Sequence, residues 1–413
     1  MRQSRVLVIG GGAAGLSAAI SAARLGADAT ILERAARVGQ KILASGNGRC
    51  NLTNVSASAS AFNHPDFVEP VVRRFGCEAV RSFFGEMGLL TRADEEGRVY
   101  PVTNAAGSVL DVLRLECSRL GVGVRCGFEV ERVSVEPGCT DFVVSSQDGE
   151  TVRADAVVVT TGGGGSLLAA LGHGLVEKVP VLGPIQTDAE PIRGLSGVRV
   201  RCAATLFADA DADNTGGRAL ATERGELLFR DYGVSGIMIF DLSRYLEPGC
   251  VISIDLFPDI GSRELHTMIS QRCTSLSWRN ADTFFVGMLH DRVARAVLRA
   301  AGVGPGAPVE KLPQTRLTVL LKGFRLKVLG VGDAAQAQVT RGGASVAEFD
   351  PDSMASRHVD GLFAAGEVLD IDGRSSGFNL HWAWASGIMA GEAAARLAMV
   401  RAAEYDVPSR GPE

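Results

Sequence analysis

The sequence predicts an α/β fold in which both ends of the chain build a domain with a parallel sheet, and a β-rich domain is inserted between them. The first observation is a βαβ pattern over residues 5–32, at the N-terminus. The second is a change after Pro184 to short alternating strands separated by Gly, Pro and Asp. The third is a return to a buried strand at residues 361–365, followed by a helix at 383–403.

The spacing of apolar residues assigns the other elements in chain order. In the N-terminal part we expect strands at residues 5–9, 29–32, 122–126, 128–135, 142–145 and 156–160, and helices at 13–25, 71–87 and 109–120. In the insert we expect strands at 198–207, 226–229 and 251–256, and helices at 263–273 and 283–301. Turns are expected at residues 136–138 and 330–335, and a frayed tail from residue 408.

Composition narrows the class of protein. With 413 residues, 46% of them hydrophobic and 22% charged, the chain is long and apolar enough for a globular core. A net charge of -5 without a long basic run argues against a nucleic-acid partner. The eight cysteines stand singly, with no CxxC pair and no His/Cys cluster of zinc spacing, so we expect reduced thiols and no metal site. Glycines interrupt the apolar stretch at residues 6–23, which favours a cytoplasmic protein over a signal peptide or a membrane span.

A phosphate-binding turn follows the first strand. Gly10, Gly12 and Gly15 form a GxGxxG motif between the expected strand and helix. Its glycines allow a tight turn, close approach of a pyrophosphate and packing of helix on strand, while the helix N-terminus attracts the phosphates. Glu33 closes the second strand about 20 residues further on, where an acid binds a ribose hydroxyl. An acid at this place favours FAD or NAD over NADP.

A polar, glycine-rich loop comes directly after Glu33. Residues 39–54 read GQKILASGNGRCNLTN. A dinucleotide that ends in a flavin explains such a loop, because the chain must follow the pyrophosphate toward the ring. The alternative is a solvated surface loop, since turn residues are common there.

The same loop resembles the GxKxxxSGxGRCNxTN segment of a bacterial flavoprotein family. That family is related in fold to glutathione reductase and includes a bile-acid enone reductase and aminoacetone oxidases. Further similar stretches lie at residues 97–101, 224–236, 340–344, 366–373 and 377–387, so the resemblance covers nearly the whole chain. Two departures stand out. The glycine-rich and aromatic segment that the family has after residues 161–165 is much shorter here, and His381 stands where glutamine is expected.

The resemblance implies the positions of an FAD site. The turn and Glu33 would hold pyrophosphate and adenosine ribose, and the start of a helix near Gly377 would face the isoalloxazine, where reduction places negative charge. Lys41, Ser45 and Gly46 would follow the pyrophosphate, Val130 would meet the adenine, Gly366 and Glu367 the ribityl phosphate, and Asn379 and Leu380 the flavin ring. The predicted cofactor-binding residues are Gly10, Gly11, Gly12, Ala13, Ala14, Gly15, Glu33, Arg34, Gln40, Lys41, Ser45, Gly46, Arg49, Asn51, Val130, Thr161, Gly162, Gly163, Gly366, Glu367, Gly377, Phe378, Asn379 and Leu380.

His381 is the candidate catalytic residue. It could stabilise the reduced flavin or shuttle a proton. The other interpretation is a structural histidine, because it stands beside Trp382 and Trp384. No metal ligand is predicted.

Taken together, these features predict an FAD-dependent oxidoreductase. A Rossmann-like three-layer FAD domain would comprise residues 1–186 and 340–413, and the β-rich insert residues 187–339, with a helical piece at 261–313. The expected reaction is reduction of an activated C=C with hydride from transiently bound NAD(P)H. Oxidation of a small, aminoacetone-like amine by oxygen is the alternative, and a non-catalytic flavin sensor or a tRNA-modifying flavoprotein is the alternative of another class. The expected partner is a small-molecule substrate, with no nucleic acid and no membrane.

Overall fold

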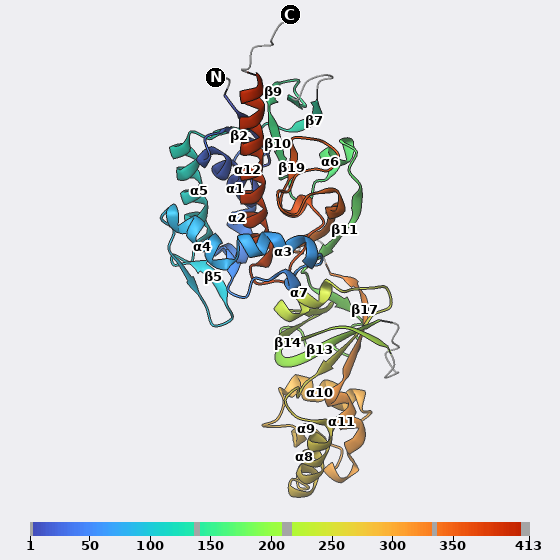
Figure 1. Cartoon of the computed structure of the whole chain (residues 1–413). Coiled ribbons are helices and arrows are strands. Elements are labelled where there is room, and N and C mark those ends of the chain that lie inside the picture. Colours follow the sequence, from blue (N-terminus) through green and yellow to red (C-terminus); the bar gives the residue numbers. More distant parts are fainter. Residues whose placement is uncertain (1–2, 136–140, 209–216, 333–336, 406–413) are drawn as a thin grey trace, which may run out of the picture. The chain divides into compact units, whose positions relative to one another are not determined.

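The chain folds into two compact units. The computed structural model describes residues 3–135, 141–208, 217–332 and 337–405 (Figure 1). The first unit comprises Met1–Val179 and Val339–Glu413, and the second unit comprises Pro180–Gln338. Each unit has a hydrophobic core of its own. The turns predicted at residues 136–138 and 330–335 and the tail predicted from residue 408 lie wholly or partly outside the described residues.

A parallel sheet forms the centre of the first unit. Its strand order is β19-β10-β1-β2-β6, and every neighbouring pair is parallel. The strands are β1 (Arg5–Ile9), β2 (Asp28–Glu33), β6 (Gly123–Cys126), β10 (Ala156–Val159) and β19 (Leu362–Ala364). The three middle strands are nearly continuous apolar runs because a parallel sheet is covered on both faces. The edge strand β19 comes from the C-terminal part of the chain.

Two helices from opposite ends of the chain pack directly on each other beside this sheet. They are α1 (Ala13–Arg24) and α12 (Phe378–Tyr405), and α1 also contacts α5 (Ala106–Leu120). A Cβ built on Gly391 of α12 would lie 2.1 Å from the Ala18 carbonyl oxygen, and one on Gly387 would lie 2.4 Å from that of Ala14. The helix backbones therefore touch, with no room for a side chain between them.

Antiparallel sheets complete the first unit. β7 (Val130–Val135), β8 (Phe142–Ser146) and β9 (Thr151–Ala154) form one of them, and β9 leads into β10 of the parallel sheet. Helices, parallel sheet and antiparallel sheet are the three layers expected from the sequence. Two smaller sheets pair β3 (Thr53–Asn54) and β4 (Thr91–Ala93) with β5 (Arg98–Pro101), and β11 (Leu175–Val181) with β18 (Val339–Ala344).

The second unit is a closed antiparallel barrel with helices. The barrel consists of β12 (Ile185–Thr187), β15 (Gly233–Ser235), β14 (Arg218–Arg230), β13 (Arg199–Ala208), β16 (Val251–Asp255) and β17 (Phe324–Val331). Its helices are α7 (Ile237–Ser243), α8 (Ser262–Ser275), α9 (Ala281–Phe284), α10 (Asp291–Ala300) and α11 (Gln314–Lys322). The prediction of a β-rich part with a helical piece is confirmed, and β14 is much longer than the strand expected at 226–229.

Two helices predicted as single elements are each broken in two. Residues 71–87 contain the end of α3 (Pro65–Arg74) and all of α4 (Cys77–Glu86), because Phe75 and Gly76 leave the helical conformation. Residues 283–301 contain the end of α9 and all of α10, and between them Gly287 adopts a φ of +82° that ends any continuous helix. The helical spacing of apolar residues continues across both breaks. For this reason the sequence pattern predicted one helix at each place. Among the described residues, no helix is both long and apolar enough to cross a membrane.

The contact of α1 with α12 gives the first prediction. Gly391→Ala should lower the free energy of unfolding by about 1–3 kcal/mol, since the added methyl group meets the α1 backbone and outweighs the helix propensity of alanine. Gly107→Ala in α5 is the matched control, because its Cβ would meet nothing within 4 Å. The control should be neutral or stabilising by up to about 1 kcal/mol. Urea unfolding of both variants measures this, and equal stability of the two would contradict the close contact.

Candidate functional site

The glycine-rich turn between β1 and α1 has the geometry of an anion cradle. Gly10 has a φ of +106°, and a Cβ there would lie 2.6 Å from the Thr160 carbonyl oxygen. At Gly15 a Cβ would lie 1.8 Å from the Gly10 oxygen, so both positions require glycine. A Cβ at Gly12, in contrast, would meet nothing within 4 Å. This open side, beside the free N–H groups of the first turn of α1, fits a pyrophosphate.

Glu33 lies beside this turn at the end of β2. Its carboxylate accepts hydrogen bonds from the backbone N–H of Gly11 at 2.6 Å and of Ala35 at 2.8 Å. Each carboxylate oxygen keeps a lone pair for a ribose hydroxyl. The N–H of Phe128 donates to the Glu33 carbonyl, which brings the chain just before Val130 to the end of β2. The residues predicted for adenosine thus lie at one end of the sheet.

Three predicted residues from distant segments meet next to the turn. Lys41 Nζ lies 3.3 Å from Glu367 Oε2, and a Cβ on Gly162 would lie 3.2 Å from the same nitrogen. The Lys41 side chain is 80% exposed, so this ion pair adds little stability by itself. A Cβ on Gly366 would lie 2.9 Å from Cβ of Ala14, so the chain after β19 also reaches the start of α1.

The loop after residue 50 meets the first turns of α12. Thr53 Oγ1 is 2.8 Å from His381 Nδ1, and a Cβ on Gly377 would lie 2.7 Å from Asn51 Oδ1. Two polar atoms here, Asn51 Oδ1 and His381 Nε2, are buried and have no hydrogen-bond partner within the described chain. A buried polar atom without a partner costs about 1–3 kcal/mol, so a ligand is expected to provide one. These two atoms are candidate hydrogen-bond partners of a flavin.

His381 is neutral at physiological pH. Its side chain is fully buried, and this burial lowers its pKa to about 4. When Nδ1 accepts the hydrogen of the Thr53 hydroxyl, Nε2 carries a proton and can donate it in a hydrogen bond. Thr53 was not among the predicted site residues. It lies within the motif at residues 39–54, but only the fold reveals that its hydroxyl meets the histidine ring.

Two side chains at the start of α12 make contacts within the chain. The Asn379 amide group bonds to the backbone N–H and carbonyl of Gly373 and to the Arg374 carbonyl. It therefore fixes the preceding loop. The Phe378 ring packs edge-on against Phe62 at 6.2 Å in the core. Leu380 is half-buried.

The remaining predicted site residues are either exposed or bonded within the loops that they belong to. Arg34 and Gln40 are exposed. Ser45 Oγ donates to the Ile42 carbonyl, the Arg49 guanidinium lies 5.0 Å from the Tyr100 ring centre, and Thr161 Oγ1 donates to the Gly164 carbonyl. These contacts order the loops at Gly46 and at Gly162 and Gly163. Thr340, whose N–H donates to Glu367 Oε1, was missed by the residue-level prediction.

Comparison with known proteins identifies relatives along nearly the full length. The family model described as HI0933-like protein Rossmann domain matches residues 4–393. The 3-dehydro-bile acid delta(4,6)-reductase of Clostridium scindens is 33% identical, over 95% of this chain and 99% of its own. The ribosomal RNA dihydrouridine synthase of Escherichia coli is 28% identical, over 94% and 96%.

Two solved structures are similar at lower identity. The open conformation of a flavocytochrome c3 fumarate reductase is 18% identical, covers 96% of this chain and 79% of its own, and has a TM-score of 0.46. The 3-ketosteroid-delta4-(5alpha)-dehydrogenase of Rhodococcus jostii RHA1 is 16% identical, with coverages of 96% and 98% and a TM-score of 0.48.

The position of Glu33 beside the glycine-rich turn leads us to expect that its side chain contributes to FAD affinity. Glu33→Ala should weaken FAD binding about 10- to 150-fold, since a lost charge-assisted hydrogen bond is worth about 1.5–3 kcal/mol. Titrating apoprotein with FAD and following flavin fluorescence measures the dissociation constant. Asp28→Ala, at the other end of β2, is the control and should bind FAD as the parent does. Unchanged affinity in Glu33→Ala would mean that the ribose lies elsewhere.

The lowered pKa of His381 leads us to expect that the stability of the protein depends on pH. The unfolded chain protonates this ring below a pKa of about 6.5, whereas the folded protein resists protonation down to about 4, so stability falls as pH drops between these values. At pH 5 the loss due to His381 should be about 2 kcal/mol. His381→Gln removes this titration, so its urea-unfolding free energy should fall less from pH 7 to pH 5 than that of the parent, both measured as apoprotein. An equal fall in both proteins would place the ring in contact with solvent.

Proposed function

The chain belongs to the HI0933-like family, and from this premise we propose that it reduces a carbon–carbon double bond conjugated to a carbonyl, with NAD(P)H as electron donor. It is an FAD-dependent oxidoreductase. The observation that carries the finer proposal is the similarity to a named reductase over almost all of both chains, at 33% identity.

The chemistry of the named relatives supports this choice. A delta(4,6)-reductase of a 3-dehydro steroid acts on double bonds conjugated to a ketone. A dihydrouridine synthase saturates the double bond of a uracil ring, which is also conjugated to a carbonyl. In both reactions hydride adds to a carbon atom that is electron-poor because negative charge can move onto the carbonyl oxygen. We infer that this chain shares the reaction type, while the molecule that carries the double bond differs between relatives.

The site residues have distinct tasks in such a reaction. Bound FAD would supply hydride transfer, and the protein supplies position and field. The glycine turn and Glu33 would hold pyrophosphate and ribose, and Lys41 would add a positive charge beside them. The N-terminus of α12 would favour negative charge near the ring. His381, neutral and held by Thr53, would donate a hydrogen bond from Nε2 without carrying a charge of its own.

The first unit is the cofactor-binding domain in this proposal. The predicted boundaries, 1–186 and 340–413 for that domain and 187–339 for the insert, remain part of the proposal.

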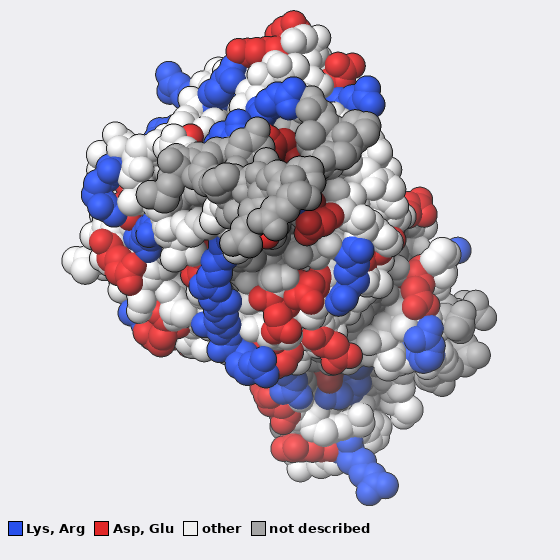
Figure 2. Space-filling model, turned by 45° about the horizontal axis from the view of Figure 1, so that its top comes forward, with Lys and Arg blue, Asp and Glu red and all other residues white. Residues whose placement is uncertain are grey.

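A small-molecule substrate is proposed as partner. On the face shown in Figure 2, basic and acidic side chains are interspersed among the described residues, unlike the single-sign surface that binds a phosphate backbone.

Three other functions remain as outcomes of the test. A flavin oxidase of a small, aminoacetone-like amine would be reduced by the amine and reoxidised by oxygen. An RNA-modifying flavoprotein is supported by the similarity to the ribosomal RNA dihydrouridine synthase of Escherichia coli, at 28% identity. A non-catalytic flavin sensor would show no turnover with any of these substrates.

Anaerobic mixing distinguishes these functions. NADH or NADPH should bleach the visible flavin absorbance, and a 3-oxo steroid with a conjugated double bond should restore it. The matched saturated 3-oxo steroid should not, because it offers no electron-poor alkene carbon. Bleaching by aminoacetone but by neither nicotinamide would establish the oxidase instead. Restoration by uridine-containing RNA alone would establish the RNA substrate.

A further inference from the structure

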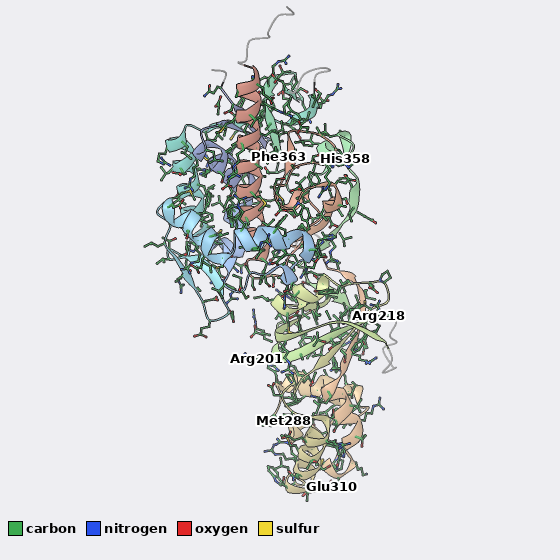
Figure 3. All side chains as sticks on the ribbon, in the orientation of Figure 1. Arg201, Arg218, Met288, Glu310, His358 and Phe363 are labelled. Atoms are coloured by element: carbon green, nitrogen blue, oxygen red, sulfur yellow. The ribbon has the colours of Figure 1, made fainter. Side chains whose placement is uncertain are left out.

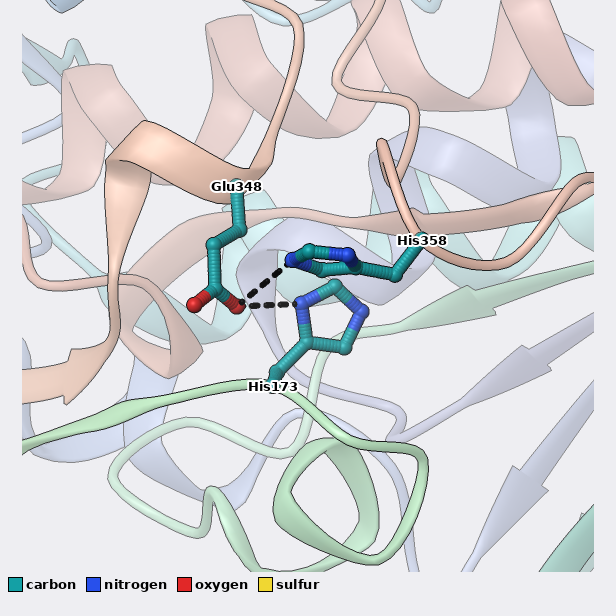
Figure 4. Close-up of side chains that lie close together, drawn as sticks. All are labelled: His173, Glu348 and His358. Atoms are coloured by element: carbon teal, nitrogen blue, oxygen red, sulfur yellow. Dashed lines mark hydrogen bonds and ion pairs between the residues drawn. The ribbon is translucent and has the colours of Figure 1, made fainter.

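Three side chains that the cofactor site does not use come together elsewhere in the first unit. His173 follows the short helix α6 (Ser166–Ala170), Glu348 ends the 3-10 turn η5 (Val346–Glu348), and His358 lies in the loop before β19 (Figures 3 and 4). Glu348 Oε2 lies 2.9 Å from His173 Nδ1 and 3.5 Å from His358 Nε2. All three ligand atoms lie within 4.8 Å of one another.

These separations are close to those of a tetrahedral metal site. With metal–ligand bonds of about 2.0–2.1 Å, tetrahedral geometry places neighbouring ligand atoms about 3.3 Å apart. The two separations that involve Glu348 lie on either side of this value, and the third, between the two histidine nitrogens, is no more than 4.8 Å, so side-chain shifts would be needed to admit an ion. Two imidazoles and a carboxylate are a ligand set that suits zinc and neighbouring divalent transition metals.

Two of the ligands are already held in place by other groups. The second ring nitrogen of His173, Nε2, is 3.0 Å from Ser356 Oγ, and the ring stacks on Phe349 at 4.6 Å. The N–H of Gly174 donates to both oxygens of Glu348, at 3.0 and 3.2 Å. Ser356 Oγ also accepts the N–H groups of His358 and Val359, so its hydroxyl donates to Nε2 and the proton of the neutral ring lies on Nδ1, toward Glu348. An ion at Nδ1 would require this proton to move to Nε2, with the Ser356 hydroxyl turning to accept it, and Ser356 would then fix the ring orientation. Burial lowers the pKa of His173, which favours the neutral ring that binds metals.

The cluster is buried on one side and open on the other. The His173 side chain is fully buried, whereas those of Glu348 and His358 are 24% and 49% exposed. An ion could enter from this exposed side, and its fourth position would be taken by water.

We propose that His173, Glu348 and His358 bind a divalent transition-metal ion, with Zn²⁺ as the best fit, in a three-ligand site with an open fourth position. The ion would tie the loop at His173 to the two segments that precede β19. The sequence analysis expected no metal site, since the ligands are far apart in the chain and have no recognisable spacing.

The test uses the FAD-loaded protein after dialysis against a chelator. Competition with a chromophoric zinc chelator should give one bound Zn²⁺ per chain, and Co²⁺ in its place should give the intense visible bands of four-coordinate cobalt. Zn²⁺ should also raise the unfolding temperature, because it binds only the folded state. Absence of zinc binding would overturn the proposal and leave the cluster as an ordinary hydrogen-bonded group.

Variants separate this site from binding elsewhere on the surface. His358→Ala and Glu348→Gln should each lower zinc affinity about 100-fold or more and abolish the rise in unfolding temperature. Ser356→Ala, which removes the partner of His173 Nε2 and the acceptor of the His358 and Val359 N–H groups, should lower affinity about 10-fold. His266→Ala, in α8 of the second unit, is the control and should bind zinc as the parent does. Flavin content and circular dichroism verify that each variant is folded. Equal affinity in the parent and in His358→Ala would overturn the assignment.

Discussion

The direct backbone contact between α1 and α12 is the constraint on which the site depends. α1 begins at the glycine-rich turn, and α12 begins at the segment that meets the loop after residue 50. Gly387 and Gly391 allow the two helices to approach until a Cβ on either glycine would collide with the carbonyl of Ala14 or Ala18. Any larger residue would push the C-terminal segments away from the turn. The close contact of the two helices thus holds the C-terminal segments near the turn.

Hydrogen bonds from side chains of α12 also fix the loops at Gly366 and at Leu52. Trp382 Nε1 donates to the Gly366 carbonyl, and Ser386 Oγ accepts from the Gly366 N–H. Trp384 Nε1 donates to the Leu52 carbonyl, one residue from Thr53. The two tryptophans are therefore not only packing groups, because their ring nitrogens fix the backbone of two site segments in a buried environment, where an unpaired N–H is costly.

The sequence predicted those parts of the fold and of the site whose residues are close together in the chain. The turn from Gly10 to Gly15 and Glu33 could be placed on neighbouring strands, because strand, turn and helix follow one another in the chain. The helix breaks at Gly76 and Gly287 could not be predicted, since the apolar spacing continues across them. The partners of Asn379 and His381 depend on which loops α12 meets, and no local pattern contains that information. The cluster of His173, Glu348 and His358 was hidden for the same reason.

The position of β19 at the edge of the parallel sheet has a consequence for biosynthesis. The first unit needs β19 and α12, which leave the ribosome after the second unit, whereas the second unit is one uninterrupted stretch of chain. At about 5–20 residues per second, the second unit is complete several seconds before the sheet can be finished. During this interval β10 lacks its outer neighbour, and the buried face of α1 lacks α12. The nascent first unit is thus the part of this protein that a chaperone would have to shield.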